Sequence, residues 1–404
     1  MENPAAFCHN YPLQATAVDR ASPASHSAAM RFIHTADWQI GKPFRNFGEK
    51  DGVLRQARLS AIEAIGRLAA QEGAAHVLVA GDLYDNDAPA PKTLLEPLER
   101  MRAFPSVHWH IIPGNHDYHR GNGLWDRAAA PGLPANVVFH LAPEPVALGG
   151  HAVLFPAPLR RRSEVNDLTD WMDAAASAEG LIRIGLAHGS VTGFGTDGEA
   201  NNPIAADRAK RAGLSYLALG DWHRTMQVNA TTWYAGTPEA DRFNSQEAGQ
   251  VLLVDIAGPG AAPAVTPRRT GAFRWLAQAE ELAGAEDLAA VEQRLRNHAD
   301  LSNLLMRLTI KGTLDLTARA GLSSRLQSLE AAMFWLEANL EDLHARPTMD
   351  DLEKIDFGGV LREAAEVLKG AAENPASSAV ERRRAEEALV QLFIMAKDAK
   401  VQAA

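Results

Sequence analysis

Cysteine is almost missing from this chain of 404 residues, which contains only Cys8. A single cysteine excludes an internal disulfide framework and fits a protein of the reducing cytoplasm, where we expect this chain to be located. Long hydrophobic runs are missing as well, since no stretch reaches the ~20 apolar residues that a membrane span requires. We therefore expect no transmembrane segment.

An excess of basic charge is also missing, since the net charge is −10. This balance argues against a protein that binds nucleic acid over its whole surface, although a local basic face is compatible with it. Hydrophobic residues make up 46% of the sequence and charged residues 22%, as in an ordinary globular protein. Residues 1–29 differ: they are rich in Ala, Ser and Pro, and we expect a disordered N-terminal extension.

Short apolar runs alternate with helical patterns between Met30 and Ile256. The stretch from Leu54 to Leu68 has apolar residues at helical spacing. Several runs are apolar throughout, as expected of strands in a sheet covered on both faces. We predict a layered α/β domain over 30–256. Its predicted strands cover 31–36, 76–82, 107–117, 151–158, 181–189, 215–221 and 249–256.

The pattern changes in the C-terminal part of the chain. We predict a small second α/β domain over 257–345, with strands where apolar and polar residues alternate and two helices between them. These strands cover 306–311 and 334–341, and the helices 285–298 and 321–331. Residues 346–404 have helical patterns, including a capping-box signature from Ser378 to Glu381. One apolar stripe there is expected to contact a partner and consists of Leu389, Leu392, Phe393 and Ala396.

Side chains with metal-binding chemistry follow five of the predicted strands, where open α/β sheets place ligand sites. Carboxylate, imidazole and amide groups together suit divalent manganese, magnesium, iron or zinc. Two ions would use all the candidate ligands and would suit hydrolysis of phosphate esters. The candidates are Asp37, Gln39, Asp82, Asn115, His188, Asp221 and His223, and His116 adjoins them. The histidines expected to be structural or on the surface are His76, His108, His110, His140 and His151.

Five motifs in this order resemble the calcineurin-like metallophosphoesterases: "HTADW", "GDLYD", "PGNHD", "AHG" and "GDWH". Within that family, "RFIHTADW", "YAGTPEADRFN" and "GQVLLVDI" resemble the SbcD/Mre-type DNA-repair exonucleases. The resemblance implies a sandwich of sheets flanked by helices, a small α/β cap over 257–345 and a C-terminal helical segment. It also implies a DNA exonuclease or endonuclease of DNA repair that works with an SMC-like ATPase, bound through the C-terminal helices.

The resemblance also implies roles for single residues. Asp37, position 39 and His223 would bind one metal, Asp82 would bridge, and the second metal would be held by Asn115, His188 and position 221. His116 would donate a proton to the leaving group, oriented by Asp117. The family commonly has histidine where this chain has Gln39 and Asp221. Because both changes replace nitrogen with oxygen, we expect two manganese ions, with magnesium or iron as alternatives, and a weaker site at Gln39.

Basic residues near the motifs are candidates for contacts with DNA phosphates. They are Lys42, Arg45, Arg160, Arg161, Arg162 and Arg224. Two other functions remain open on the sequence: a phosphodiesterase for small molecules such as cyclic nucleotides, and a weakly active scaffold that binds DNA or the ATPase. The terminal helices could equally pack on the chain's own body or form a homodimer.

Overall fold

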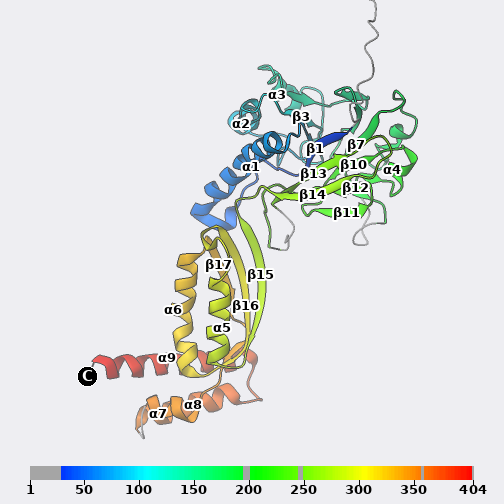
Figure 1. The fold of residues 1–404 in the computed structure, drawn as a ribbon. Helices are drawn as coiled ribbons and strands as arrows, with labels where there is room; N and C mark the ends of the chain where they lie inside the picture. The colour runs from blue at the N-terminus through cyan, green and yellow to red at the C-terminus, as the bar shows by residue number, and fades with distance from the viewer. Residues whose placement is uncertain (1–28, 194–200, 244–248, 356–358, 403–404) are drawn as a thin grey trace, which may run out of the picture.

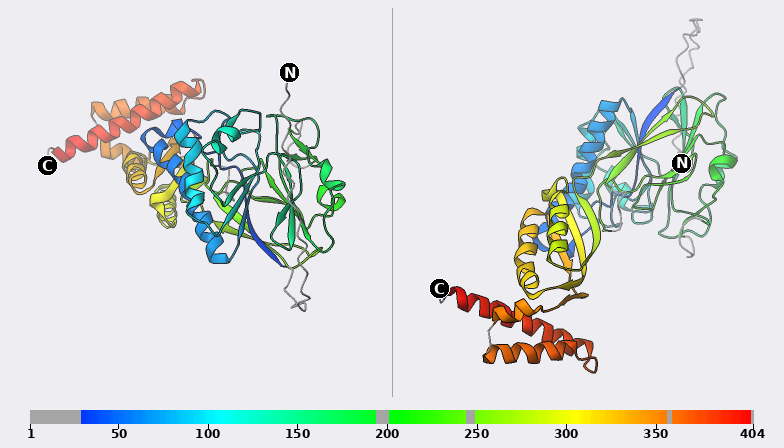
Figure 2. Two further views of the ribbon diagram at one scale, coloured as in Figure 1. Left: turned by 90° about the horizontal axis from the view of Figure 1, so that it is seen from above. Right: turned by 60° about the horizontal axis from the view of Figure 1, so that its bottom comes forward.

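The computed structural model describes residues 29–193, 201–243, 249–355 and 359–402. The molecule is elongated, with a large sandwich of two sheets at one end and the C-terminal helices at the other (Figures 1 and 2). A smaller sheet with its helices lies between them. The expected disordered extension 1–29 lies, apart from residue 29, outside the described residues.

The apolar runs nearest the N-terminus form the first sheet of the sandwich. Its strands follow the order β14-β13-β1-β2-β3-β4, in which β1 to β4 are parallel and β13 and β14 are antiparallel to their neighbours. Phe32 and Ile33 of β1 point to opposite faces and are both fully buried, because both faces are covered. The strands are β1 (Met30–Thr35), β2 (His76–Val79), β3 (His108–Ile111), β4 (Val137–Phe139), β13 (Gln250–Ile256) and β14 (Ala264–Arg269).

The second sheet has the order β11-β12-β10-β7-β6-β5, with a parallel centre from β12 to β6 and an antiparallel strand at each edge. Its strands are β5 (Val146–Leu148), β6 (Ala152–Ala157), β7 (Ile182–His188), β10 (Tyr216–Gly220), β11 (Met226–Asn229) and β12 (Thr232–Tyr234). A short parallel pair, β8 (Ser190–Val191) and β9 (Pro203–Ile204), lies beside it.

Helices cover the outer face of each sheet. α1 (Asp51–Glu72), α2 (Pro91–Arg102) and α3 (Leu124–Ala129) pack on the first sheet, where Ile62 and Ile65 of α1 are fully buried. η2 (Asp170–Asp173) and α4 (Arg208–Arg211) pack on the second sheet. Between the sheets lies a core that includes Phe32, Leu154 and Ile184. The predicted fold class, a layered α/β sandwich with sheets flanked by helices, is therefore confirmed.

The smaller sheet contains three parallel strands in the order β15-β16-β17, and β18 pairs with the far end of β16. Met306, Leu308 and Ile310 of β16 are buried under the two helices that cover one face. The elements are β15 (Arg274–Leu282), α5 (Ala285–Arg296), η3 (Leu301–Asn303), β16 (Leu304–Leu314), α6 (Leu316–Ala332), β17 (Trp335–Asn339) and β18 (Leu343–Ala345). The boundary expected at residue 257 needs correction, because β14 pairs with β13 inside the sandwich and the smaller sheet starts only at β15.

Three helices form the C-terminal end: α7 (Met349–Ile355), α8 (Val360–Glu373) and α9 (Ala379–Gln402). The apolar stripe expected to contact a partner is mostly buried here, since Leu389 and Phe393 pack against Leu316 of α6 and Leu352 of α7. That part of the prediction is corrected: the stripe is core. None of the helices in the described ranges is long and apolar enough to cross a membrane.

Four of the histidines without an expected role form a row across β2, β3 and the end of β4. His76 Nδ1 lies 3.0 Å from His110 Nε2, and His110 Nδ1 lies 3.0 Å from His140 Nε2. The ring of His108 stacks on that of His76 at 5.5 Å. Burial, helped by His140 and His76, lowers the pKa of His110 to about 2, so this central histidine of the row is neutral at ordinary pH.

Candidate metal centre

The polar residues that follow the strands meet at one edge of the sandwich. Asp37 follows β1 and Asp82 follows β2 in the first sheet, whereas His188 ends β7 and Asp221 follows β10 in the second. Parallel neighbours end at the same edge of a sheet. The two sheets therefore build the site jointly, each from strand ends that the sequence had indicated.

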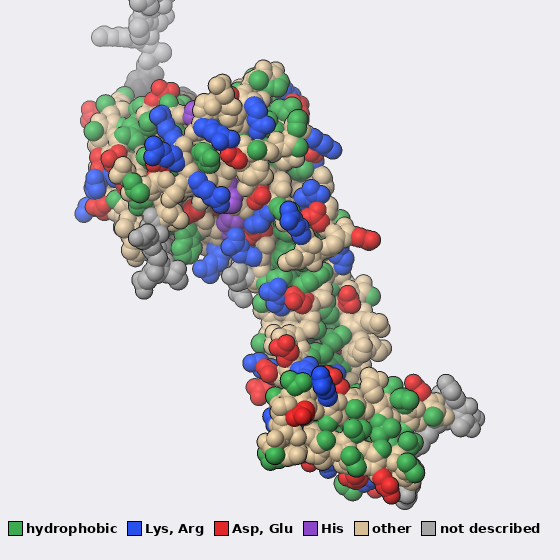
Figure 3. Space-filling model, turned by 180° about the vertical axis from the view of Figure 1, so that it is seen from behind, with side chains coloured by type: hydrophobic (Ala, Val, Ile, Leu, Met, Phe, Trp, Pro, Cys, Tyr) green, Lys and Arg blue, Asp and Glu red, His purple; other side chains and the backbone are tan. Residues whose placement is uncertain are grey.

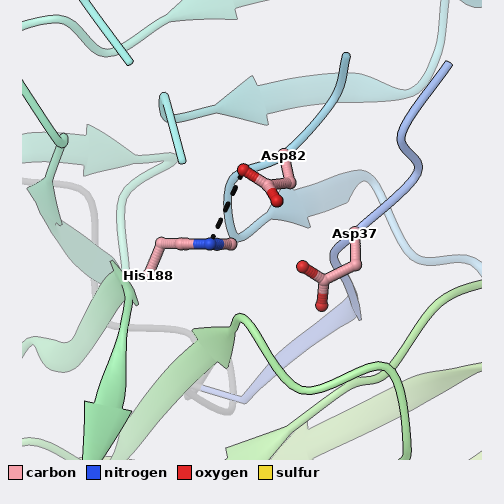
Figure 4. A group of neighbouring side chains, drawn as sticks. All are labelled: Asp37, Asp82 and His188. Carbon is pink, nitrogen blue, oxygen red and sulfur yellow. Dashed lines mark ion pairs between the residues drawn. The ribbon is translucent and has the colours of Figure 1, made fainter. Parts of the chain in front are cut away.

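Asp37, Asp82 and His188 form the tightest group (Figure 4). All three are buried, and one ligand atom of each lies within 4.8 Å of the other two. His188 Nε2 is 3.6 Å from Asp82 Oδ1 and 3.8 Å from Asp221 Oδ1. Two carboxylates and an imidazole at this spacing are a suitable donor set for a divalent cation.

Two buried polar atoms without hydrogen-bond partners show whether a cation fits this site. His188 Nδ1 donates its proton to the Ala80 carbonyl over 2.8 Å, so Nε2 is the nitrogen whose lone pair the neutral ring can offer to a cation. Within the described part of the chain, this buried Nε2 has no hydrogen-bond partner, and neither does the buried Oδ1 of Asn115. Buried polar atoms normally have a partner. A cation held by these atoms and by the carboxylates would satisfy both, so the donor set fits a metal.

The backbone around the centre is strained in the way that functional sites often are. Asp37, Gln39, Asp82 and Asp221 have positive φ angles of 55°, 41°, 53° and 106°. Residues with a side chain rarely adopt this conformation. Gly114 permits the close packing of the loops, because a Cβ atom there would lie 2.2 Å from Asp82 Oδ1. The loops are therefore shaped to bring acidic side chains together.

The crowded acidic groups shift one another's pKa. Burial raises the pKa of Asp37 to about 6, with Asp82 and Asp221 adding to the rise and His223 and His188 opposing it. Burial alone would lower the pKa of His188, but Asp82, Asp37 and Asp221 raise it to about 9. The site therefore attracts positive charge, which is what a cation would supply.

Gln39 does not direct its oxygen to this group. Its Oε1 accepts a hydrogen bond from Lys42 Nζ over 2.9 Å, and its Nε2 lies 3.5 Å from Asp82 Oδ2. The expected ligand atom is therefore engaged by an ammonium group, and the carboxamide would have to rotate to present oxygen to a metal. This corrects the simple expectation for Gln39, although the side chain is buried beside Asp82.

Asp221 lies beside the group, with its Oδ1 3.8 Å from His188 Nε2. Its backbone N–H donates to both carboxylate oxygens of Asp37, at 3.1 and 3.2 Å. Its Oδ1 lies 3.4 Å from Asn115 Nδ2, and its Oδ2 accepts a hydrogen bond from the Ser190 hydroxyl over 2.9 Å. The carboxylate is therefore fixed between the residues expected to hold the second ion.

His223 is oriented by Asp241, a residue that the sequence reasoning missed. His223 Nδ1 is 3.0 Å from Asp241 Oδ2, and the same oxygen lies 3.0 Å from Arg58 and 2.5 Å from Lys42 Nζ. Burial favours the neutral acid, but His223, Arg58 and Lys42 hold the pKa of Asp241 well below its usual value. A carboxylate behind a metal-binding histidine fixes its ring and leaves Nε2 for the metal. In the sequence, Asp241 looks like an ordinary acid beside Arg242.

His116 and Asp117 have separate environments. The Nδ1 of His116 lies 2.8 Å from the Asp85 carbonyl, which fixes the ring, and its Nε2 is 4.0 Å from Asp82 Oδ2. Asp117 was expected to orient His116, but it is fully buried and accepts hydrogen bonds from the backbone of Tyr84 and Gly114 instead. The expectation for Asp117 is corrected: it ties two loops of the site together.

The basic residues expected to contact DNA fall into two groups. Lys42 is half-buried and already engaged by Gln39 and Asp241, so its expected role as a phosphate contact is corrected. The other five are exposed: Arg45, Arg160, Arg161, Arg162 and Arg224. Figure 3 shows Lys and Arg side chains around the histidines visible on one face of the sandwich.

Comparison with known proteins places this geometry in context. The calcineurin-like phosphoesterase family model matches residues 30–225. The SbcD component of the SbcCD nuclease of Bacillus subtilis (strain 168) is 26% identical over 276 residues, which cover 57% of this chain and 67% of that protein. Among solved structures, TT1561 of Thermus thermophilus is 12% identical, with a TM-score of 0.38, and the match covers 60% of this chain and 99% of that one. GAP50 of Plasmodium is 10% identical, with a TM-score of 0.37, over 60% of this chain and 85% of that one.

Proposed function

We propose that this chain is a manganese-dependent nuclease of DNA repair, built on residues 30–225, which match the calcineurin-like phosphoesterase family model. The observation that carries this proposal is the pair of buried atoms His188 Nε2 and Asn115 Oδ1, neither of which has a hydrogen-bond partner within the described residues. The similarity to the SbcD component of the SbcCD nuclease supports DNA as the substrate.

The proposed ligands form two sets that share Asp82. Asp37 and His223 would hold one ion, with Gln39 after rotation of its carboxamide, and Asn115, His188 and Asp221 would hold the other. When bound, the ions supply activation of water and neutralisation of phosphate charge. Oxygen atoms dominate the sets, which supports manganese over zinc.

His116 acts on the leaving group in this proposal. Its ring is fixed through Nδ1 by the Asp85 carbonyl, so the ring does not depend on the metal for its orientation. A proton on Nε2 can be given to the departing oxygen, as general acids do. Its side chain is 31% exposed, so a substrate can reach it.

The proposed partner, an SMC-like ATPase, would bind the exposed face of the C-terminal helices. Val360 and Val367 of α8 and Met395 of α9 are 80%, 71% and 67% exposed. Exposed apolar side chains gathered on one surface are typical of interaction sites. Val367→Glu should abolish co-purification with the ATPase, and unchanged co-purification would contradict this surface.

A comparison of substrates tests the proposed activity. The full chain is stripped of metal and supplied with manganese, magnesium or zinc, and then given duplex DNA, single-stranded DNA, a cyclic nucleotide and bis-p-nitrophenyl phosphate. We expect manganese-dependent DNA cleavage, lost by at least about a hundredfold in Asp82→Asn, because a direct metal ligand contributes more than the residues that orient it. Asp87→Asn, which weakens an ion pair with Arg120 away from the proposed ligands, is the matched control.

The results separate the alternatives. Hydrolysis of the cyclic nucleotide without DNA cleavage would replace the nuclease by a small-molecule phosphodiesterase. DNA binding without hydrolysis of any substrate would indicate a scaffold. Full activity of Asp82→Asn would contradict the metal centre itself.

A further inference from the structure

An open groove of about 770 Å³ lies where the sandwich meets the smaller sheet. Four aromatic side chains line it, and we call it the aromatic groove. Phe47 comes from η1 (Arg45–Lys50) and Phe243 from the segment before β13, whereas Trp275 and Trp335 come from β15 and β17. Residues that are far apart in the sequence therefore meet on one surface.

The groove includes the face of the smaller sheet that α5 and α6 leave uncovered. Trp275, Leu305 and Trp335 are paired side by side on the three strands, and Ala277, Arg307 and Glu337 form the next row on the same face. The helices cover the opposite face, where Met306 and Leu308 are buried. An uncovered sheet face that presents aromatic side chains is a device by which proteins stack unpaired bases.

The four aromatic rings pack against one another in a cluster. Trp275 and Phe243 are 3% and 9% exposed and lie 5.0 Å apart between centroids, so they form its base. Phe47 and Trp335 are half-buried, and their centroids are 5.0 Å apart. Their remaining surface is open to the groove, which leaves aromatic area for a flat, apolar ligand group.

Polar groups in the groove suit a nucleotide better than a purely apolar ligand. The guanidinium of Arg307 lies 4.5 Å from the Phe243 ring centroid and is paired with Glu337 at 2.9 Å. Because Glu337 offsets the charge of Arg307, this end of the groove favours a base more than a phosphate.

The groove is continuous with the metal centre. Asp241 and Arg242 line the groove, and both contact His223 Nδ1, Asp241 at 3.0 Å and Arg242 at 2.9 Å. Arg242 is exposed and pairs with Asp241 at 3.2 Å, but Asp241 is shared with Lys42 and Arg58, so positive charge remains for a phosphate beside the centre. A DNA strand with one phosphate at the metal centre would therefore place its neighbouring nucleotides next to the aromatic rings.

We propose that the aromatic groove binds unpaired nucleotides of the DNA strand next to the cleaved phosphate, with their bases stacked on Trp335 and Phe47. The proposal rests on the proposed function, because it takes the strand to be a substrate of the centre. It adds a preference: single strands and frayed or overhanging ends should bind better than blunt duplex, whose bases are already stacked on each other.

Binding measured without metal tests the groove separately from catalysis. Fluorescence anisotropy of the full chain in EDTA is recorded with a labelled oligothymidylate and with a blunt duplex of equal length. Stacking on one aromatic side chain strengthens binding of single strands by about tenfold or more. Trp335→Ala should therefore weaken oligothymidylate binding by about tenfold, while Trp335→Phe should restore most of it. Quenching of tryptophan fluorescence by the oligonucleotide should be smaller in Trp335→Phe, because a stacked indole has been removed.

Trp171→Ala is the matched control, since Trp171 is a half-buried tryptophan on η2, at the far face of the second sheet. Thermal unfolding of each variant shows whether it is folded. Equal oligothymidylate affinities of folded Trp335→Ala and Trp171→Ala would overturn the proposal, as would blunt duplex bound as well as the single strand.

Hydrolysis of bis-p-nitrophenyl phosphate by the unmodified protein keeps the two proposals distinguishable. Hydrolysis without Trp335-dependent strand binding overturns the groove and leaves the hydrolase. Trp335-dependent strand binding without hydrolysis of any substrate supports the groove and overturns the nuclease.

Discussion

Lys42 donates a hydrogen bond to the amide oxygen of Gln39 over 2.9 Å, and that oxygen is the atom expected to replace a histidine nitrogen at the metal centre. Lys42 also lies 2.5 Å from Asp241, the carboxylate that orients His223. A fixed positive charge therefore stands beside one half of the centre. It competes with a metal for the oxygen of Gln39 and repels the metal that would bind there.

The two ions should consequently differ in affinity, with the Asp37–Gln39–His223 ion the weaker. Gln39→His should tighten that site, because an imidazole nitrogen needs no rotation away from Lys42. Lys42→Met should tighten it too, by removing the competing charge. Titration of manganese into stripped protein by calorimetry measures both. Two equal affinities, unchanged in Gln39→His, would show that Gln39 is no ligand.

His116 should act in chemistry without holding metal. Because the Asp85 carbonyl fixes its ring, His116→Ala should keep the metal content while losing about 10²–10⁴ in rate, the usual contribution of a general acid. Metal analysis alongside turnover tests this division. An exposed histidine, His151, provides the control substitution. Loss of metal together with activity would make His116 a ligand or a structural support.

The histidine row should make the fold sensitive to acid. The pKa of folded His110 is lowered to about 2, mainly by burial, whereas an unfolded histidine titrates near 6.5. The unfolded chain therefore binds more protons as pH falls through 6.5. The free energy of unfolding should then drop by about 2 kcal/mol for this group between pH 7.5 and 5.

Urea unfolding at the two pH values, on the unmodified protein and on His110→Leu, measures that drop. The variant should lose less stability on acidification, whatever its stability at neutral pH. His151→Leu is the control, because His151 is exposed. The same drop in His110→Leu as in the unmodified protein would assign the acid sensitivity to other groups.

Phe393 should hold the C-terminal helices onto α6. It is 3% exposed and packs in a cluster with Leu316 and Leu352, so Phe393→Ala should destabilise this cluster by about 3–5 kcal/mol. In Phe393→Ala we expect faster amide hydrogen exchange in α7 to α9 and unchanged exchange in the sandwich. Met395→Ala, at a 67% exposed position, should change little. Unchanged exchange in Phe393→Ala would show that the cluster does not depend on this ring.

Sequence patterns predicted the strands that carry the centre, since β1, β2, β7 and β10 are apolar runs that end in a polar motif. They did not predict β14 as part of the sandwich or β15 at all. β14 belongs to the sandwich because it pairs with β13, and sequence patterns do not report such pairing. β15 was missed because it contains Ala and Glu residues, which have a weak preference for strands.

Adjacency in sequence also misled the assignment of roles. Asp117 follows His116, yet its side chain turns into the protein, and Lys42 turns toward Asp241 although it lies near a metal motif. The aromatic groove could not be predicted, because its rings come from four separate segments. Periodicity reports burial, but only the tertiary fold decides which distant residues meet.

Strand β16 runs from Leu304 to Leu314, the full length of the smaller sheet. At about 3.3 Å per residue, its 11 residues span roughly 35 Å. Leu305 near one end packs with Trp275 in the aromatic cluster, whereas Gly312 near the other end pairs with β18, which lies against α9. One continuous backbone thus joins the terminal helices to the aromatic rings beside the candidate metal centre, so the two ends of the molecule share a single strand.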